Sequence, residues 1–323
     1  MTAVLQELSE RVHRLGGEVR SGEPLAAHTT LRVGGPAAAF VRVETMASLA
    51  AVAEICARHG VGWLILGRGS NLLVADEGWS GVVVTLGRGF RGVTGVGPCE
   101  NGNVHMVVGA AEPMPVLATT SARHGLSGLA FGTAIPGTLG GAVRMNAGAH
   151  GSQLRDVLAW AEVARMSQGG VIERLAATDL AMCYRHTALP ADAVVVRAGL
   201  VLRLASPGAL AVEMAEMRRW RREHQPVNAP SCGSVFRNPR GDSAGRLIDT
   251  AGMKGYTVGG AQVSLVHANF ITASPGAKAA DVYEVINAVR DAVAARHGVA
   301  LETEVVLAGF IGSDESTGWG RIS

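Results

Sequence analysis

The spacing of hydrophobic positions predicts a chain in which helices and strands alternate. Val4, Leu5, Leu8, Val12 and Leu15 recur at helical spacing, and the glycine pair that follows them ends the pattern. Similar patterns predict further helices over residues 46–59, 113–124, 138–146, 209–224, 244–251 and 278–297. Short apolar runs predict strands over residues 38–43, 63–66, 81–86, 104–109, 194–204 and 300–308. We therefore expect a fold of mixed α/β class.

The length of the chain favours more than one domain. At roughly 150 residues per domain, 323 residues correspond to two or three domains. The segment Ser206-Pro207-Gly208 separates a long apolar strand pattern from a strongly basic helix. We place a domain boundary at this segment.

Composition argues against several classes of protein. Only 17% of the residues are charged and the net charge is +2, so the sequence lacks the basic character typical of nucleic-acid-binding proteins. No apolar run reaches the roughly 18 residues of a membrane helix, and the N-terminus lacks a signal-peptide pattern. The four cysteines include no CxxC pair, and the ten histidines show no HxxxH spacing. We expect a cytoplasmic protein without a metal site.

Two short motifs suggest functions that their surroundings do not support. GRGFRG at 87–92 matches the dinucleotide-binding pattern GxGxxG, but VTGVGPCENGN after it cannot begin the helix that this motif needs. GDSAG at 241–245 matches the nucleophile pattern GxSxG, but it follows a loop rather than a strand. We expect a glycine-rich turn at the first motif, and a helix cap by Asp242 or Ser243 at the second.

Three other segments point to a ligand that is held largely by main-chain groups. LGRGSNLLV at 66–74 places a turn between two apolar runs, and such a turn can direct consecutive backbone N–H groups at an anion. FGTAIPGTLGGAVRMNAGAHG at 131–151 begins a short helix with small residues, which gives a phosphate access to free N–H groups. SCGSVFRNP at 231–239 places Ser234 directly after a glycine.

These segments, with four others, carry a resemblance to a known family. LGRGSNLLV, AIPGTLGGAVRMNAGAHG, YRHT, CGSVFRNP, AGMKGYTVGGAQVS, HANF and LETEV follow one another along the chain. In this order they closely resemble the UDP-N-acetylenolpyruvoylglucosamine reductase family. The resemblance extends from about His28 to Gly309, which is nearly the whole chain.

The resemblance implies a fold and a cofactor. The fold is an FAD-binding fold of the vanillyl-alcohol-oxidase type in two subdomains, 1–86 and 87–206, with a smaller α/β substrate-binding domain at 207–308. Residues 309–323 are expected to return to the first subdomain. Noncovalent FAD is expected to contact Gly67, Arg68, Gly69, Ser70, Asn71, Leu72, Ile135, Pro136, Gly137, Thr138 and Gly141. Arg68 departs from the glycine that is commonest in the family at this position.

The resemblance also implies a reaction. NADPH reduces the flavin, which then reduces UDP-N-acetylglucosamine enolpyruvate to UDP-N-acetylmuramate in peptidoglycan precursor synthesis. Negative charge develops on the substrate carboxylate, and Arg185 matches the arginine that would bind it. Ser234 matches the family's proton donor. Glu304 matches the family's glutamate, which must be protonated to assist an enolate. Glu302, two positions away, is the less expected of the two glutamates.

Further positions match the surroundings of the sugar nucleotide. These substrate-binding candidates are Arg237, Asn238, Lys254 and Gln262. The basic helix adds Arg218, Arg219, Arg221 and Arg222, which either attract the substrate or form a solvated helix face. The chain lacks the insertions that carry a covering tyrosine in longer family members, so it resembles the shorter type. We expect a monomer that binds neither nucleic acid nor a membrane.

Two alternatives stay open from the sequence. Another oxidase or dehydrogenase of the same flavin fold could attach FAD through a histidine, and His150 lies in a segment expected to face the cofactor. A flavin-binding relative without activity would lack a catalytic residue, but Arg185, Ser234 and Glu304 are all present.

Overall fold

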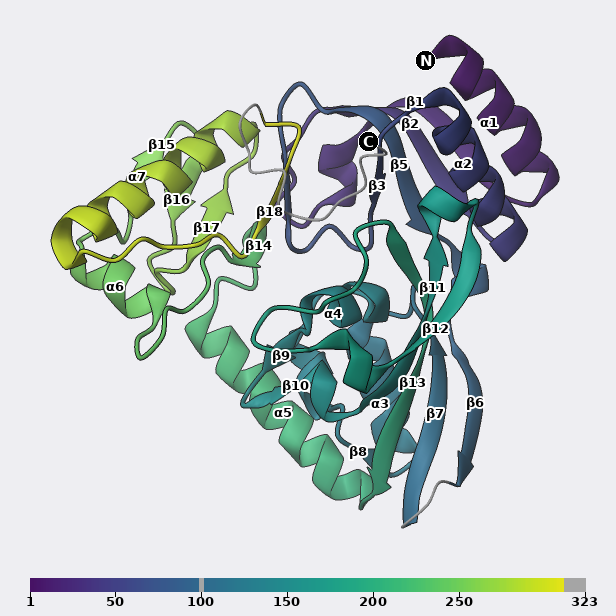
Figure 1. The fold of residues 1–323 in the computed structure, drawn as a ribbon. Coiled ribbons are helices and arrows are strands. Elements are labelled where there is room, and N and C mark those ends of the chain that lie inside the picture. The colour runs from purple at the N-terminus through teal and green to yellow at the C-terminus, as the bar shows by residue number, and fades with distance from the viewer. Residues whose placement is uncertain (99–101, 311–323) are drawn as a thin grey trace.

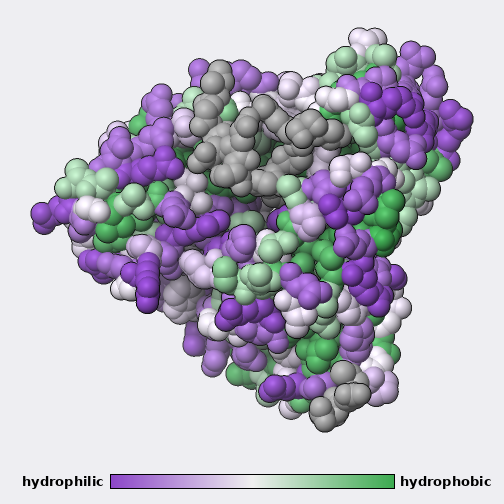
Figure 2. All heavy atoms as spheres, viewed as in Figure 1, coloured by the Kyte–Doolittle hydropathy of each residue, from purple (hydrophilic) through white to green (hydrophobic). Residues whose placement is uncertain are grey.

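The computed structural model describes residues 1–98 and 102–310, which form three lobes (Figure 1). Each lobe is built on its own β-sheet, and the three sheets follow one another along the chain. The N-terminal lobe is mostly purple in Figure 1, the central lobe blue to teal and the C-terminal lobe green to yellow. Hydrophilic residues cover much of the face shown in Figure 2, including the outer side of the N-terminal lobe. In the described part of the chain, no helix is long and apolar enough to cross a membrane.

The first sheet has the order β1-β2-β5-β3, with β2, β5 and β3 parallel. Its strands are β1 (Glu18–Pro24), β2 (Pro36–Val43), β5 (Trp79–Leu86) and β3 (Trp63–Ile65). Helices α1 (Thr2–Arg14) and α2 (Met46–His59) pack in one apolar core with this sheet, where Leu8 and Leu49 are fully buried. Thr45 caps α2, and Gly60 ends it in the left-handed conformation. The helices and strands predicted in this part are confirmed.

The second sheet is antiparallel, with the order β12-β11-β13-β7-β6 and a short strand β8 beside β13. Its strands are β6 (Val93–Pro98), β7 (Asn103–Gly109), β8 (Leu126–Ser127), β11 (Leu158–Arg165), β12 (Val171–Ala176) and β13 (Ala193–Leu204). Helices α3 (Met114–Arg123) and α4 (Leu139–Met145) share its core. A strand, β6, follows the GRGFRG motif, which excludes a dinucleotide-binding βαβ unit there.

Several short elements complete the first two lobes. Strands β9 (Gly148–Ala149) and β10 (Ser152–Gln153) form a small hairpin after α4. The 3-10 helices are η1 (Leu25–His28), η2 (Arg88–Phe90), η4 (Ala130–Ala134), η5 (Leu154–Asp156), η6 (Met166–Gln168) and η7 (Ala177–Leu180).

Helix α5 (Pro207–His224) leads from the second lobe to the third. The third sheet has the order β14-β17-β16-β15, formed by β14 (Ser231–Ser234), β17 (Phe270–Ala273), β16 (Ala261–Val263) and β15 (Thr257–Val258). Helices α6 (Ala244–Thr250) and α7 (Ala279–His297) share its core. Ser243 caps α6, since its hydroxyl accepts a hydrogen bond from Arg246 N at 3.2 Å. The GDSAG motif is therefore a helix start, as predicted.

The predicted strand at 300–308 is wrong over most of its length. Only β18 (Val306–Ala308) is a strand, and it pairs in parallel with β4 (Leu72–Val74) of the first lobe. Residues 302–305 instead bond irregularly to the segment after β14, with Glu304 N donating to Val235 O at 2.7 Å. The chain thus returns to the first lobe at 306–308. Of the residues 309–323 that were expected to return to the first subdomain, 311–323 lie outside the described residues, and the predicted domain limits stay a prediction.

Candidate active site

A cavity of about 1130 Å³ lies among the three lobes. Most of its wall comes from within residues 27–32, 64–72, 134–150, 220–221 and 225–234, together with Arg185, Asn238, Phe270, Glu304 and Val306. Typical pockets for small ligands measure about 300–1,000 Å³. The cavity therefore has room for a large cofactor together with a substrate.

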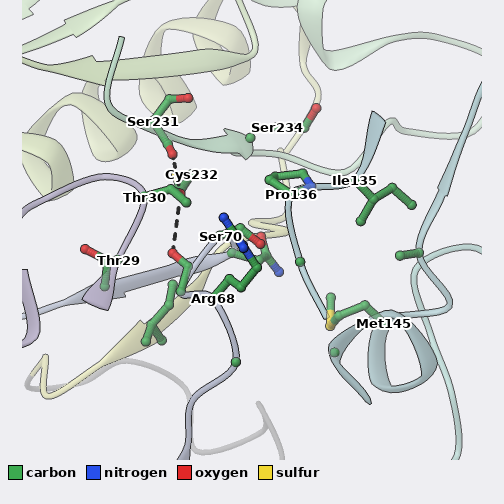
Figure 3. Close-up of a pocket in the computed structure, with 18 of the residues that line it drawn as sticks. Thr29, Thr30, Arg68, Ser70, Ile135, Pro136, Met145, Ser231, Cys232 and Ser234 are labelled. Carbon is green, nitrogen blue, oxygen red and sulfur yellow. Dashed lines mark hydrogen bonds between the residues drawn. The ribbon is translucent and has the colours of Figure 1, made fainter. Parts of the chain in front are cut away.

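Two backbone loops face each other in this wall. A Cβ atom on Gly67 would lie 2.9 Å from Thr138 Oγ1, and a Cβ atom on Gly69 would lie 2.3 Å from His28 O. Gly69 also has a left-handed φ of 58°, which a side chain disfavours. The first loop must therefore carry glycine to pack this closely. Figure 3 shows Arg68 and Ser70 of this loop, with Ile135 and Pro136 of the second loop nearby.

Each of the residues predicted to contact FAD lines the cavity. Thr138 is the N-cap of α4, and its hydroxyl accepts a hydrogen bond from Gly141 N at 3.5 Å. Thr30 links the first loop to the third lobe, because its hydroxyl bonds to Ser231 O at 2.6 Å and to Gly69 O at 3.4 Å (Figure 3). The cavity is thus lined by backbone from lobes that are far apart in sequence.

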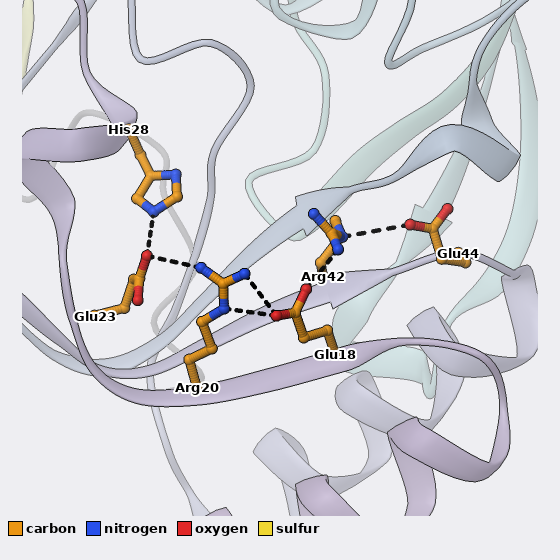
Figure 4. A network of polar contacts seen from close by, with 6 residues as sticks. All are labelled: Glu18, Arg20, Glu23, His28, Arg42 and Glu44. Atoms are coloured by element: carbon orange, nitrogen blue, oxygen red, sulfur yellow. Dashed lines mark hydrogen bonds and ion pairs between the residues drawn. The ribbon is translucent and has the colours of Figure 1, made fainter.

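The rim of the cavity at His28 is supported by charges on the first sheet. His28 Nε2 lies 2.7 Å from Glu23 Oε1, and its ring stacks on Phe40 at 4.4 Å. Glu23 also pairs with Arg20 at 3.1 Å. The network continues through Glu18 and Arg42 to Glu44 (Figure 4). These contacts hold the 28–30 segment against Gly69.

Arg185 and Glu304, which are 119 positions apart, form an ion pair in the cavity wall. Arg185 Nε donates to Glu304 Oε1 at 2.7 Å, and its Nη2 donates to Gly148 O at 2.9 Å. The Arg185 side chain is 19% exposed and that of Glu304 is 14% exposed. Arg185 has a left-handed φ of 53°, a conformation that costs free energy and is common at functional sites. The structure thus brings together two of the three predicted catalytic residues.

Burial and charge act in opposite directions on Glu304. Burial raises the pKa of its carboxyl group, and the nearby Arg185 and Arg237 lower it by less, so the pKa is raised overall. The short ion pair alone would indicate an ionised carboxylate. Burial therefore makes this carboxyl group easier to protonate than an exposed glutamate, because a charge in the protein interior loses its hydration. Glu302, two positions away, has a side chain that is 78% exposed. In a regular strand the two glutamates would share one face, so the irregular backbone at 302–305 is what separates them.

Ser234 ends β14 on the wall of the same cavity, beside the loop turn at Gly233. The bond from Glu304 N to Val235 O connects its segment directly to Glu304. All three predicted catalytic residues therefore line one cavity with the two backbone loops.

Of the four predicted substrate-binding residues, one lines the cavity and three do not. Asn238 lines the cavity, and its Oδ1 accepts a hydrogen bond from Ala244 N at 3.0 Å. Arg237 pairs weakly with Glu302 at 3.7 Å, Lys254 pairs with Asp249 at 3.0 Å, and Gln262 Nε2 donates to Thr257 Oγ1 at 3.1 Å. These last three are not among the residues that line the cavity.

The end of α5 supplies two cavity residues: Arg221, one of the four arginines named from the sequence, and Trp220, which the sequence did not single out. Trp220 and Arg221 line the cavity, whereas Arg218 donates to Thr133 Oγ1 at 2.8 Å and Arg222 is exposed. Burial lowers the pKa of Arg221, and its Nε donates to Gln225 Oε1 at 3.0 Å. The helical pattern shows that the arginines lie on different faces, but not which face meets a cavity.

The cavity wall carries an excess of positive charge. Its arginines are Arg32, Arg68, Arg144, Arg185 and Arg221. Among the described residues, Glu304 is the one carboxylate in the wall. Such a wall suits ligands with phosphate and carboxylate groups.

Comparisons with known proteins agree with this geometry. A model of the UDP-N-acetylenolpyruvoylglucosamine reductase C-terminal domain matches residues 225–308, and an FAD binding domain model matches residues 37–174. The UDP-N-acetylenolpyruvoylglucosamine reductase of Heliobacterium modesticaldum is 42% identical over 94% of this chain and 94% of its own length. The one from Bacillus subtilis is 38% identical over 96% of this chain and 99% of its own length.

The chain belongs to the UDP-N-acetylenolpyruvoylglucosamine reductase family. A crystal structure of the reductase (MurB) from Thermus caldophilus superposes with a TM-score of 0.77 at 37% identity, covering 90% of this chain and 98% of that one. The predicted flavin-binding fold is therefore confirmed. As a member of this reductase family, the chain is an FAD-dependent oxidoreductase of peptidoglycan precursor synthesis.

Proposed function

We propose that the chain catalyses the NADPH-dependent reduction of UDP-N-acetylglucosamine enolpyruvate to UDP-N-acetylmuramate. The observation that carries this proposal is the shared cavity. Arg185, Ser234 and Glu304 line the same space as the two loops that fit a cofactor diphosphate. The name of the family agrees with this reaction.

The residues present fit FAD. Gly67 and Gly69 leave no room for a Cβ atom, so their backbone can approach a phosphate closely. Ile135 and Pro136 give the wall apolar surface for a planar ring system. When bound, FAD supplies the redox chemistry, taking a hydride from NADPH and giving it to the methylene carbon of the enol ether.

Arg185 binds the carboxylate of the enolpyruvyl group in this proposal. Its planar guanidinium can bond to two carboxylate oxygens at once, and it is already held at the cavity by Gly148 O and Glu304. A fixed cation at this position stabilises the negative charge that develops when hydride is added. In its protonated form, which burial favours by raising the pKa, Glu304 donates a hydrogen bond to the same group.

Ser234 donates the proton to the carbon next to the carboxylate. A hydroxyl is a weak acid, so this role requires the strongly basic carbon that hydride addition creates. The substrate diphosphate is bound by cavity arginines, of which Arg221 is partly buried at the end of α5.

An anaerobic experiment tests the proposal. The purified protein is reduced with NADPH, the substrate is added, and flavin absorbance is followed. We expect rapid reoxidation in the wild type and slow reoxidation in Ser234→Ala, with NADPH reduction unchanged. A colourless protein, or a reduced flavin that the enol ether does not reoxidise, would refute the proposed reaction. Flavin that stayed attached after denaturation would instead favour the oxidase alternative with a covalent bond through His150, which lines the cavity.

A further inference from the structure

A buried asparagine outside the predicted site holds the segment that follows Ser234. Asn269 is 4% exposed and lies directly before β17. Its Oδ1 accepts a hydrogen bond from Phe236 N at 2.9 Å, and its Nδ2 donates to Phe236 O at 2.8 Å. Its backbone oxygen accepts a third bond, from Val235 N at 2.9 Å. Asn269 thus satisfies both backbone groups of Phe236.

The Asn269 side chain takes over the hydrogen bonding to the 235–236 segment where the backbone pairing of β14 with β17 ends. The pairing of β14 with β17 shifts register between Ser231 and Ser234, and Gly233 has a left-handed φ of 77°. This irregularity turns the chain away from the ordinary ladder after Ser234. An amide side chain carries one acceptor and one donor group, so it can take the place of a neighbouring peptide. Without it, a buried N–H and C=O would have no partner from β17.

The other edge of the same segment holds the C-terminal part of the chain. Glu304 N donates to Val235 O at 2.7 Å, and Arg237 N donates to Glu302 O at 2.9 Å. Phe236 also forms an isolated bridge with Thr303. Residues 235–237 therefore lie between Asn269 and residues 302–304. The segment 235–237 thus follows Ser234 directly in the chain and is hydrogen-bonded to Glu304 along one edge.

We propose that Asn269 is a positioning residue that fixes Ser234 relative to Glu304. This inference rests on the proposed function, in which Ser234 donates a proton. Proton donation to carbon needs a hydroxyl at a defined place, and a displacement of about 1 Å can slow a reaction by about 100-fold. NADPH oxidation does not use this proton. Loss of Asn269 should therefore slow reduction of the enol ether and leave reduction of the flavin intact.

The test compares Asn269→Ala with a matched control, Ser264→Ala, in the FAD-loaded enzyme. Ser264 is also buried, at 3% exposed, and its hydroxyl accepts bonds from Val266 N and His267 N in the turn between β16 and β17. Both variants lose two hydrogen bonds from a buried side chain to the backbone, in or next to the same hairpin. We expect Asn269→Ala alone to slow enol ether reduction, by about 100-fold, and to show an increased solvent isotope effect. NADPH reduction should match that of Ser264→Ala.

A second variant provides a rescue. Asn269→Asp has the same shape, but an ionised carboxylate has no donor for Phe236 O. Burial beside that oxygen raises the pKa of the new carboxyl group, and its protonated form restores the donor. Enol ether reduction should be faster below this pKa and be lost as the pH rises through it, relative to Asn269→Ala at the same pH.

The outcomes separate the inference from the function on which it rests. Enol ether reduction in Asn269→Ala no slower than in Ser264→Ala, or both half-reactions slowed equally, would overturn the positioning role alone. The same holds for an Asn269→Asp enzyme whose pH profile follows that of Asn269→Ala. A wild type that cannot reduce the enol ether, or a fully active Ser234→Ala, would refute the proposed function first.

Discussion

Replacing Glu304 by glutamine tests which of two opposing effects sets the charge of its carboxyl group. The side chain is 14% exposed, and Arg185 Nε lies 2.7 Å from Oε1. Burial raises the pKa and the arginine lowers it, with burial the larger effect. Each unit by which folding raises the pKa corresponds to about 1.4 kcal/mol of preference for the neutral form.

The sign of the pH dependence follows from this direction. A folded pKa above the unfolded one gives a stabilisation that is fully present below the unfolded pKa and is lost as the pH rises through the folded pKa. Glutamine does not titrate, and its side-chain oxygen can still accept the bond from Arg185. The wild type should therefore lose stability relative to Glu304→Gln as the pH rises from the unfolded pKa of glutamate through the raised folded pKa. The loss should be about 1.4 kcal/mol per unit of pKa shift.

The assay is the unfolding free energy in urea of the FAD-loaded wild type, Glu304→Gln and Glu302→Gln across this pH range. Glu302 is the matched control, because its side chain is 78% exposed and lies 3.7 Å from Arg237. Its variant should follow the wild type at each pH. If Glu304→Gln instead became less stable than the wild type as the pH rose, the ion pair would outweigh burial. Glu304 would then be ionised, and its role as a neutral donor would be refuted.

Three further predictions concern the cavity and its supports. Gly69→Ala should lower stability by about 2–4 kcal/mol and weaken FAD retention, since the new methyl group would lie 2.3 Å from His28 O in a left-handed backbone; full flavin content after gel filtration would contradict this. Arg221→Gln should weaken binding of UDP by about ten-fold in calorimetry, and Arg222→Gln should not; equal affinities would remove Arg221 from the substrate site. Asp76→Ala should cost about 1–2 kcal/mol in urea unfolding, because the Asp76 carboxylate accepts hydrogen bonds at 2.8 and 2.9 Å from the first two amides of α7; an unchanged midpoint would show that this cap contributes nothing.

Local elements could be predicted wherever the residues themselves supply the start and the stop. The helix at 46–59 has a threonine before it and a glycine after it, and both act as caps in the structure. Ser243 shows the same rule, because a capping hydroxyl acts on its own helix, within three residues. The order of motifs was also sufficient to name the FAD loops, each residue of which lines the cavity.

Prediction failed where hydrogen-bond partners come from distant segments. Residues 300–305 were predicted to continue a strand, but they meet only the short segment 235–237. The two segments form one isolated bridge, between Phe236 and Thr303, instead of a ladder. The strand therefore starts only at Val306, where β4 offers a free edge.

The sequence by itself determined the predicted helices, the strands other than that at 300–308, the identity of the family and the residue types of the site, because these depend on neighbours along the chain and on motif order. Only the tertiary structure decided which of them act together. Arg185 meets Glu304 across 119 positions, Arg221 faces the cavity while Arg222 faces water, and Asn269 supports Ser234 from another strand. The reason is that cavity formation, burial and pKa depend on how the lobes pack against one another, and this packing leaves no repeating pattern in the sequence.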